Sequence, residues 1–344
     1  MRILHTADLH LSKKKPKTLL ALDEILKIAQ KNKIDILTIG GDLFDKDIDA
    51  EELRTELRKK FSKKDYKIVA IPGNHDIDVY REGLDFGEDF IPMLEEPFGN
   101  YTIKKLNLVT IPFTEELSQE FLVKLKNKVK PDKINILLIH CTLDIGFCAD
   151  DFGEEKKYCP ISKSELAKLN YEYILAGHFH KEINIVKLNE NSKFIYPGSP
   201  TSITRKELGK RKVVLIDFET NELSEISLKS YYYDKLILTV YPGKESETVS
   251  LINKWLAKQD IYDDNIEVII NGFISINEIE FRKKIDDLNK DVDFSHNYKN
   301  VSSVLNDPLF IKFKEKLEKS DYKNKKEIEK TLIEVASKAL IWGV

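Results

Sequence analysis

Short aliphatic runs recur through the first two-thirds of the chain, and each is followed by a polar loop and an amphipathic stretch. Apolar runs bounded by turn residues are typical of buried strands, whereas apolar positions three or four apart indicate helices. This alternation predicts an α/β layered fold. The predicted strands are Arg2–Thr6, Ile34–Ile39, Lys67–Ile71, Asn107–Ile111, Ile134–Ile139 and Tyr173–Ala176, and the predicted helices are Lys17–Lys31, Asp49–Phe61 and Glu116–Val129.

The pattern changes after residue 182, where strand-like runs follow one another closely. The runs are IVKLN, KFIYPG, KVVLIDF and LSEISLK, and we expect antiparallel pairs that complete the sheet system. A domain boundary is predicted near Tyr231–Asp234. We therefore assign residues 1–230 to a catalytic domain.

The remaining third predicts a small α+β domain and two helices. KLILTVYP, ETVSLINKWLAK, NIEVIING, the stretch Ile276–Leu288 and DVDFSHN alternate as strand, helix, strand, helix and strand. Residues 231–305 are the predicted cap domain. Residues 306–344 hold the predicted helices Leu309–Glu318 and Lys325–Trp342, with Asp307 as a helix N-cap.

Composition narrows the choice of partners and compartment. The 55 basic and 58 acidic residues nearly cancel, so any site for a polyanion must be local. We expect a cytoplasmic protein, because no signal peptide and no apolar run of about 18 residues is present. Cys141, Cys148 and Cys159 are odd in number and lack zinc-ribbon spacing, so free thiols are expected.

Side chains of metal-binding type follow several predicted strands. Asp8 and His10 end the first strand, and residues two apart on an extended segment point to the same side. Asp42 follows Gly40 and Gly41, which permit a tight turn after the second strand. Because a carboxylate has two oxygens, Asp42 can bridge two cations.

Further clusters repeat this placement after later strands. The motif PGNHD brings Asn74 and His75 together, His140 ends the run INILLI, and AGHFHK sets His178 and His180 two residues apart. Each cluster alone is more often an ordinary turn or a hydrogen-bonded histidine than a ligand site. Together the clusters hold five of the seven histidines.

Three polar residues close to these clusters are not among the predicted donors. We expect His5 to face the sheet packing. Asp45 either supports a metal ligand or, as exposed Asp residues generally favour, is a solvated surface carboxylate. Asp76 is placed to orient a neighbouring imidazole, and a simple turn carboxylate is an equally open alternative.

The joint pattern indicates a metal centre at the edge of one α/β sheet, where such folds bind ligands. Mixed carboxylate, amide and imidazole donors suit Mn, Fe, Co or Zn. The predicted donors are Asp8, His10, Asp42, Asn74, His140, His178 and His180.

The order Asp-x-His, Gly-Asp, Gly-Asn-His-Asp, His, Gly-His-x-His resembles the signature of the calcineurin-like metallophosphoesterases. The resemblance implies a four-layer β-sandwich flanked by helices and two divalent metal ions. One ion is held by Asp8, His10 and His180, the other by Asn74, His140 and His178, and Asp42 bridges both. His75 stays free of metal as a general acid or charge stabiliser.

The flanking sequence is similar to the SbcD branch of this superfamily, the counterparts of the meiotic-recombination-eleven nucleases. The segments ILHTADLHL and FIYPGSPTSITRKELGKRKVVLIDF carry this resemblance. It implies a homodimeric Mn²⁺-dependent DNA nuclease, a 3'-5' exonuclease and single-strand endonuclease. It also implies a cap that presents DNA, and C-terminal helices that bind a coiled-coil SbcC-type ABC ATPase in DNA end processing and double-strand-break repair.

Two other functions stay open at this point. One is a phosphodiesterase or phosphatase that acts on nucleotides or other small phosphoesters, because one metal site serves several substrate classes. The other is a scaffold for the ATPase with a metal site of secondary importance.

Surface features bear on the DNA hypothesis in both directions. The basic runs Lys13–Lys15, Arg205–Lys206 and Lys210–Lys212 could neutralise phosphates, or could be solvated loops. The acidic loop Cys141–Tyr158 and Ser12, which stands where the family usually has Gly, depart from the expected pattern. Apolar positions at helical spacing could pack on a partner or on this chain's own core. These positions are Phe310, Ile311, Phe313, Leu317, Ile328, Leu332, Ile333 and Val335.

Overall fold

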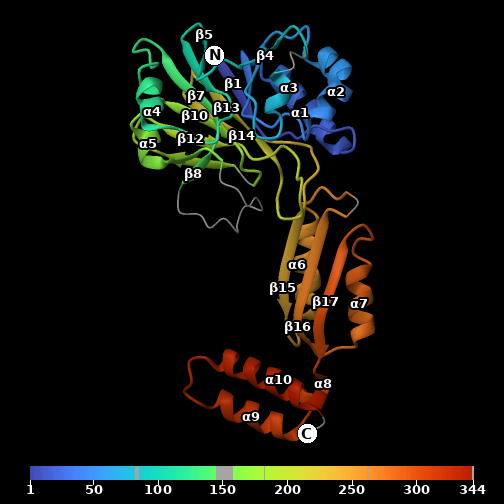
Figure 1. Cartoon of the computed structure of the whole chain (residues 1–344). Helices are drawn as coiled ribbons and strands as arrows, with labels where there is room; N and C mark the ends of the chain where they lie inside the picture. Colours follow the sequence, from blue (N-terminus) through green and yellow to red (C-terminus); the bar gives the residue numbers. More distant parts are fainter. Residues whose placement is uncertain (82–84, 145–157, 182, 263, 343–344) are drawn as a thin grey trace. The chain divides into compact units, whose positions relative to one another are not determined.

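The computed structural model describes residues 1–81, 85–144, 158–181, 183–262 and 264–342 (Figure 1). The chain forms two compact units, Met1–Tyr233 and Asp234–Val344. The division of the second unit into a cap and a partner-binding segment stays a prediction.

The first unit contains two six-stranded sheets. The first sheet has the order β14 (Glu222–Ser227), β13 (Lys212–Asp217), β1 (Arg2–Thr6), β2 (Ile36–Ile39), β3 (Lys67–Ala70) and β4 (Phe90–Pro92). The second has the order β11 (Asn184–Lys187), β12 (Lys193–Tyr196), β10 (Tyr173–Gly177), β7 (Ile134–His140), β6 (Leu106–Ile111) and β5 (Gly99–Ile103). A small parallel pair joins β8 (Thr142–Asp144) and β9 (Pro160–Ser162).

Helices cover the outer face of each sheet, as Figure 1 shows on opposite flanks of the unit. The first sheet is covered by α1 (Pro16–Lys31) and α2 (Asp47–Lys60), with the short α3 (Ile77–Arg81) beside them. The second is covered by α4 (Gln119–Lys126) and α5 (Lys163–Ala167). Adjacent residues of a strand face opposite sides, so Leu4 packs under the helices while Ile3 packs between the sheets. This arrangement confirms the four-layer sandwich.

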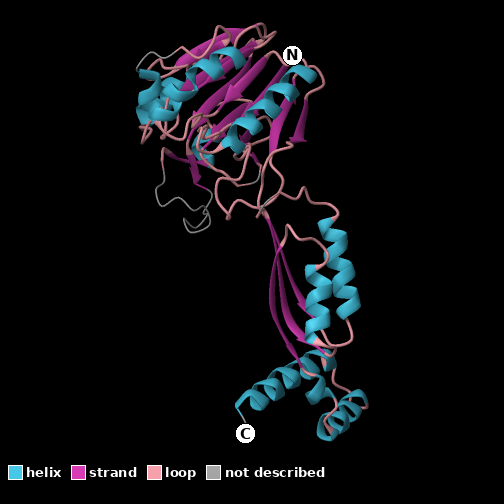
Figure 2. Cartoon of the chain, turned by 90° about the vertical axis from the view of Figure 1, so that its right-hand side faces the viewer, coloured by secondary structure: helices cyan, strands magenta, loops and turns pink. Residues whose placement is uncertain are grey.

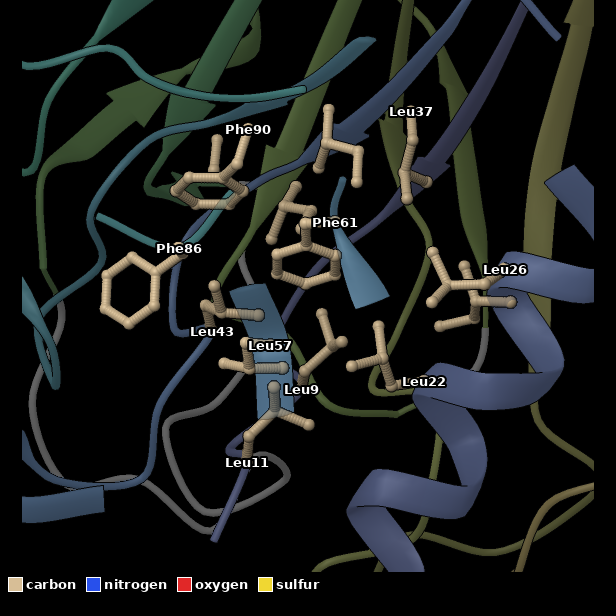
Figure 3. Packing of buried hydrophobic residues seen from close by; sticks show 14 of the residues in the cluster. Leu9, Leu11, Leu22, Leu26, Leu37, Leu43, Leu57, Phe61, Phe86 and Phe90 are labelled. Atoms are coloured by element: carbon tan, nitrogen blue, oxygen red, sulfur yellow. The ribbon is translucent and has the colours of Figure 1, made fainter. Parts of the chain in front are cut away.

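The core under α1 and α2 is densely aliphatic and aromatic. In Figure 3, Leu22 and Leu26 of α1 approach Leu37 of the first sheet, while Phe61 and Phe86 close the other side. Leu9 and Leu11, which flank a predicted metal ligand, also lie in this cluster. The loop after β1 is therefore anchored by burial on both sides of His10.

The ends of the predicted strands and helices in the first unit agree with the structure to within three residues. The prediction that all donors lie at the edge of one sheet is wrong, because the unit contains two sheets. The antiparallel pairs β11–β12 and β13–β14 form as expected, yet each pair completes a different sheet. Parallel strands buried on both faces are continuous apolar runs. Such runs do not indicate which sheet a strand joins.

A buried imidazole links the two sheets. His5 on β1 contacts the Thr38 hydroxyl at 3.0 Å through Nδ1 and the Ala176 carbonyl of β10 at 3.2 Å through Nε2. A carbonyl can only accept, so Nε2 carries the proton and Nδ1 accepts from Thr38. The expectation that His5 faces the sheet packing is confirmed.

The second unit begins with the predicted alternation. A three-stranded parallel sheet contains β15 (Asp234–Val240), β16 (Ile266–Ile274) and β17 (Asp293–Asn300). The crossover helices α6 (Glu245–Leu256) and α7 (Glu278–Asp286) lie on one face of this sheet (Figure 2).

Three helices end the chain: α8 (Ser302–Leu305), α9 (Pro308–Glu318) and α10 (Lys325–Trp342). The Asp307 side chain accepts from the Leu309 amide at 2.7 Å, which confirms the predicted N-cap. Phe310 and Ile333 are buried against Val304 in a small core. Within the described residues, no helix is long and apolar enough to cross a membrane.

The predicted free thiols are confirmed where the structure describes them. Cys141 and Cys159 are unpaired and buried. Cys148 lies outside the described residues, as do residues 145–157 of the acidic loop.

The buried His5 predicts a specific dependence of stability on acid. Burial lowers the pKa of His5 from 6.5 to about 4. Between these two values the unfolded chain binds a proton that the native ring does not, so stability falls as the pH falls through this window. The loss amounts to about 3 kcal/mol at roughly 1.4 kcal/mol per pKa unit.

We expect a His5→Gln variant to lack this loss. Urea unfolding of both proteins with a chelator, from pH 7 to pH 4, should show their stability difference shift towards the variant by about 3 kcal/mol. A difference that is constant over this range would contradict the assignment.

Candidate metal centre

All seven predicted donors converge on one site, but they come from both sheets. Asp8, Asp42 and Asn74 follow β1, β2 and β3 of the first sheet. His140 and His178 end or follow β7 and β10 of the second. The site therefore lies where the carboxyl ends of the parallel strands of the two sheets meet.

The backbone at this site adopts a conformation that non-glycine residues rarely occupy. The φ angles are 54° at Asp8, 46° at His10, 50° at Asp42 and 107° at His178. Left-handed conformations of non-glycine residues cost on the order of 1–3 kcal/mol each and gather at functional sites. Four of the seven donors thus sit on strained backbone.

Hydrogen bonds between the loops that carry the donors stabilise this strained backbone. The loop after β1 pairs with the loop after β2, since the Asp8 amide donates to the Gly41 carbonyl at 3.1 Å and the His10 amide donates to the Asp42 carbonyl at 3.0 Å. The His178 amide donates to both carboxylate oxygens of Asp8 at 3.0 Å. Asp8 therefore connects the first sheet to the second.

The buried Asp76 fixes backbone and contacts no imidazole through a hydrogen bond in the described residues. Its carboxylate accepts from the Leu43 amide at 2.8 Å, the Phe44 amide at 3.2 Å and the Gly73 amide at 2.8 Å. The imidazole-orienting role is thus wrong. Asp76 instead fastens the loop that carries Asn74 to the loop that carries Asp42.

One group of donors surrounds a first position. Asp8, His10, Asp42 and His180 each offer a ligand atom, and these atoms lie within 4.8 Å of one another. The Nε2 atoms of His10 and His180 are 3.0 Å apart. When neither nitrogen carries a proton, two lone pairs at this separation are stabilised by a cation between them.

In the second group, Asn74, His140 and His178, two possible acceptor atoms also lie close together. His140 Nδ1 lies 2.9 Å from the Gly40 carbonyl and so carries a proton, and in the neutral ring the Nε2 lone pair then faces Asn74 Oδ1 at 3.0 Å. The His178 ring lies beside that of His140, with centroids 5.2 Å apart.

Asp42 lies between the two groups. Its Oδ2 is 3.8 Å from His10 Nε2 and 3.6 Å from His140 Nε2. Asp42 is thus in reach of both groups, as a bridging ligand must be.

Charge at the site also favours cations. Asp8 and Asp42 are almost fully buried, and none of the ion pairs found in the described residues joins either one to Lys or Arg. Burial raises the pKa of Asp8 to about 6. Burial acts in the same direction on Asp42, but the imidazoles of His140 and His10 outweigh it and hold the pKa of Asp42 below its ordinary value.

Two of the imidazoles are in the neutral form that binds metal, whereas at His140 the carboxylates of Asp42 and Asp8 outweigh burial and raise the pKa. Burial lowers the pKa of His10 to about 4 and that of His178 to about 3. Both rings are therefore neutral at pH 7, with lone pairs available. The donor set fits divalent cations.

His75 and Asp45 stand at the solvent side of the site. The His75 ring is exposed and lies 4.8 Å from the His10 ring, edge to face, while its amide donates to Asp42 at 3.0 Å. Asp45 is not a freely solvated carboxylate, because its Oδ1 lies 3.6 Å from His10 Nδ1 and 2.7 Å from the Lys15 ammonium. These neighbours lower the pKa of Asp45.

Two residues of the basic and flanking segments have structural roles that their sequence context did not reveal. Arg211, predicted as a phosphate-binding residue, is buried and donates to the carbonyls of His180 and Lys181 at 2.6 Å. Ser12 is buried and donates to Asp49 at 2.6 Å, so the departure from Gly fixes the first loop to α2. Arg211 is therefore not a DNA-facing cation.

The calcineurin-like phosphoesterase family matches residues 1–182, which is more than half of the chain. The chain belongs to this family. Membership implies a metal-dependent phosphoester hydrolase, in agreement with the cluster of buried donors.

Several known proteins are similar to parts of this chain. The chain is 25% identical over 264 residues to a Staphylococcus epidermidis protein named as the D component of the nuclease SbcCD, covering 65% of this chain and 67% of that protein. It is 22% identical over 252 residues to the uncharacterized metallophosphoesterase YhaO of Bacillus subtilis, covering 65% of this chain and 59% of that protein. A dimetal phosphatase structure from Danio rerio superposes with a TM-score of 0.42 at 9% identity, over 66% of this chain and 96% of the other.

A methyl group at Gly41 should displace a metal ligand. Gly41 has φ +103°, and a Cβ there would lie 2.3 Å from His140 Nδ1. We expect Gly41→Ala to weaken Mn²⁺ binding about tenfold or more, because His140 must move. Calorimetric titration of the metal-free protein measures this affinity.

The matched control is Gly243→Ala in the second unit. Gly243 has φ +80° and open space around its Cβ position, so the variant imposes backbone strain without a clash. Equal metal affinity in Gly41→Ala and Gly243→Ala would contradict the role given to His140.

Proposed function

We propose that this chain is the nuclease component of a DNA end-processing complex, a Mn²⁺-dependent phosphodiesterase that acts with an SbcC-type ABC ATPase. The convergence of seven donors into two groups joined by Asp42 is the observation that carries the hydrolase chemistry. The relative named as a nuclease component supports DNA as the substrate.

In this proposal each donor group holds one ion. Asp8, His10 and His180 hold the first, and Asn74, His140 and His178 hold the second. Asp42 serves both. Two bound divalent ions supply an activated water and stabilise charge on the attacked phosphoryl group.

His75 is the side chain that we propose acts on the leaving-group oxygen. It is exposed at the mouth of the site, and its amide is tied to Asp42, so the loop fixes its ring beside the donors. Such a ring can protonate a leaving oxygen or stabilise its negative charge.

Exposed cations near the first loop support contact with a polyanion. Lys13 and Lys14 are exposed beside the loop that carries Asp8, and Arg205 and Lys206 are exposed in the segment that precedes β13. Phosphates would be neutralised by these residues.

The C-terminal helices support a partner surface in part. Phe310, Leu317 and Ile333 are buried on this chain, as the self-packing alternative predicted. Ile311 and Val335 remain 45% and 58% exposed. We propose these exposed positions as contacts for the helices of the ATPase, and the homodimer stays a prediction.

The second candidate is a phosphodiesterase for small phosphoesters. The formal charge of -3 and the burial of Arg211 favour it, because both reduce the cationic surface available to DNA. The metal chemistry is the same in both candidates.

Removing His75 should separate chemistry from metal binding. We expect His75→Ala to cleave labelled single- and double-stranded DNA about a hundredfold to ten-thousandfold more slowly in Mn²⁺, because proton transfer or charge stabilisation is lost. It should still bind two ions.

An Asn74→Ala variant is the companion, since it should lose activity together with one ion. Hydrolysis of a small phosphodiester by wild-type protein, with every DNA substrate left intact, would replace the nuclease with the second candidate. Undiminished DNA cleavage by His75→Ala would refute the role of His75.

A further inference from the structure

A buried carboxylate that is not among the predicted donors faces one of them. Glu207 lies in the segment between β12 and β13, and it is only 4% exposed. Its Oε1 is 3.5 Å from Nδ1 of His180. A carboxylate is almost never buried without a purpose that offsets its desolvation.

Glu207 is held from several sides, which fixes its direction. Its carboxylate accepts from the amides of Ile203 at 2.8 Å and Thr204 at 3.2 Å, and from the hydroxyls of Ser199 and Thr204 at 3.1 Å. These hydrogen bonds hold the Glu207 carboxylate in place independently of its contact with His180. It is a pre-formed acceptor rather than a mobile surface acid.

The backbone of His180 is held by a second device. The guanidinium of Arg211 donates to the carbonyls of His180 and Lys181 at 2.6 Å, and to that of Ser199 at 3.0 Å. The backbone amide of Ser199 also donates to the His180 carbonyl at 3.3 Å. Arg211 therefore fixes the position of the His180 backbone, and Glu207 contacts the His180 ring.

We infer that Glu207 is a positioning residue that sets the tautomer and orientation of His180 for metal binding. A carboxylate opposite Nδ1 favours the proton on that nitrogen, so the lone pair remains on Nε2. That Nε2 is the atom 3.0 Å from His10 Nε2, at the first metal position. This inference rests on the proposed metal site.

Glu207 is analogous to the Gly40 carbonyl at the other position. The Gly40 oxygen holds Nδ1 of His140 at 2.9 Å and directs its Nε2 toward Asn74. Each group thus has an imidazole whose far nitrogen lies against an oxygen of the protein, and in the first group His10 Nδ1 also lies 3.6 Å from Asp45. The oxygen that faces His180 belongs to a side chain, so it can be altered by substitution.

The test is a calorimetric titration of metal-free protein with Mn²⁺, comparing wild type with Glu207→Gln. We expect the variant to bind one ion about 10- to 100-fold more weakly, the range found for partners of metal-bound histidines, while the other ion binds as before. The control Glu225→Gln removes an exposed carboxylate of β14, paired with Lys212, and should bind both ions normally. Thermal unfolding without metal checks that each variant is folded.

A second measurement needs no change at Glu207. Proton–nitrogen correlation spectra of the metal-free wild type, with the His180 signal identified by its loss in His180→Gln, should show the proton on Nδ1. A proton on Nε2, or a folded Glu207→Gln that binds both ions within about twofold of wild type, overturns the inference and leaves the metal site intact. Wild-type protein that takes up no Mn²⁺ overturns the metal site itself, and the inference with it.

Discussion

Two carboxylates buried without a basic partner impose the main constraint on this fold. Asp8 and Asp42 lie among imidazoles, and the described ion pairs give them no Lys or Arg. Burying uncompensated charge is costly, so the arrangement depends on divalent cations for balance. The strained backbone at both residues is explained by the same requirement, because it directs their oxygens toward a shared centre.

The centre depends in turn on the close approach of two sheets. A Cβ at Gly177 of β10 would lie 2.1 Å from the Gly40 carbonyl, so the strand ends nearly touch there. His5 of β1 links the same two sheets at the neighbouring residue of β10, Ala176. These contacts between the sheets thus lie close to the metal centre, and they hold the donors of one sheet against those of the other. Neither sheet alone carries a complete set of donors.

The sequence predicted the donors because each follows a recognisable apolar run, and a strand's end is marked by local residues. It did not predict that Asp42 and His140 come from different sheets, since sheet membership is decided by long-range packing. Glu207 was missed for the same reason, because 27 positions separate it from His180 and no spacing rule connects them. Arg211 was assigned to the surface from its basic neighbours, whereas the structure buries it under the carbonyls that it binds.

A bridging carboxylate that joins two metal positions is the central feature of this proposed site. The most direct measurement is anomalous diffraction from crystals grown with Mn²⁺. We predict two peaks on either side of the Asp42 carboxylate, one against Asp8, His10 and His180 and the other against Asn74, His140 and His178. A single peak, or manganese bound elsewhere with these side chains unligated, would contradict the two-metal centre.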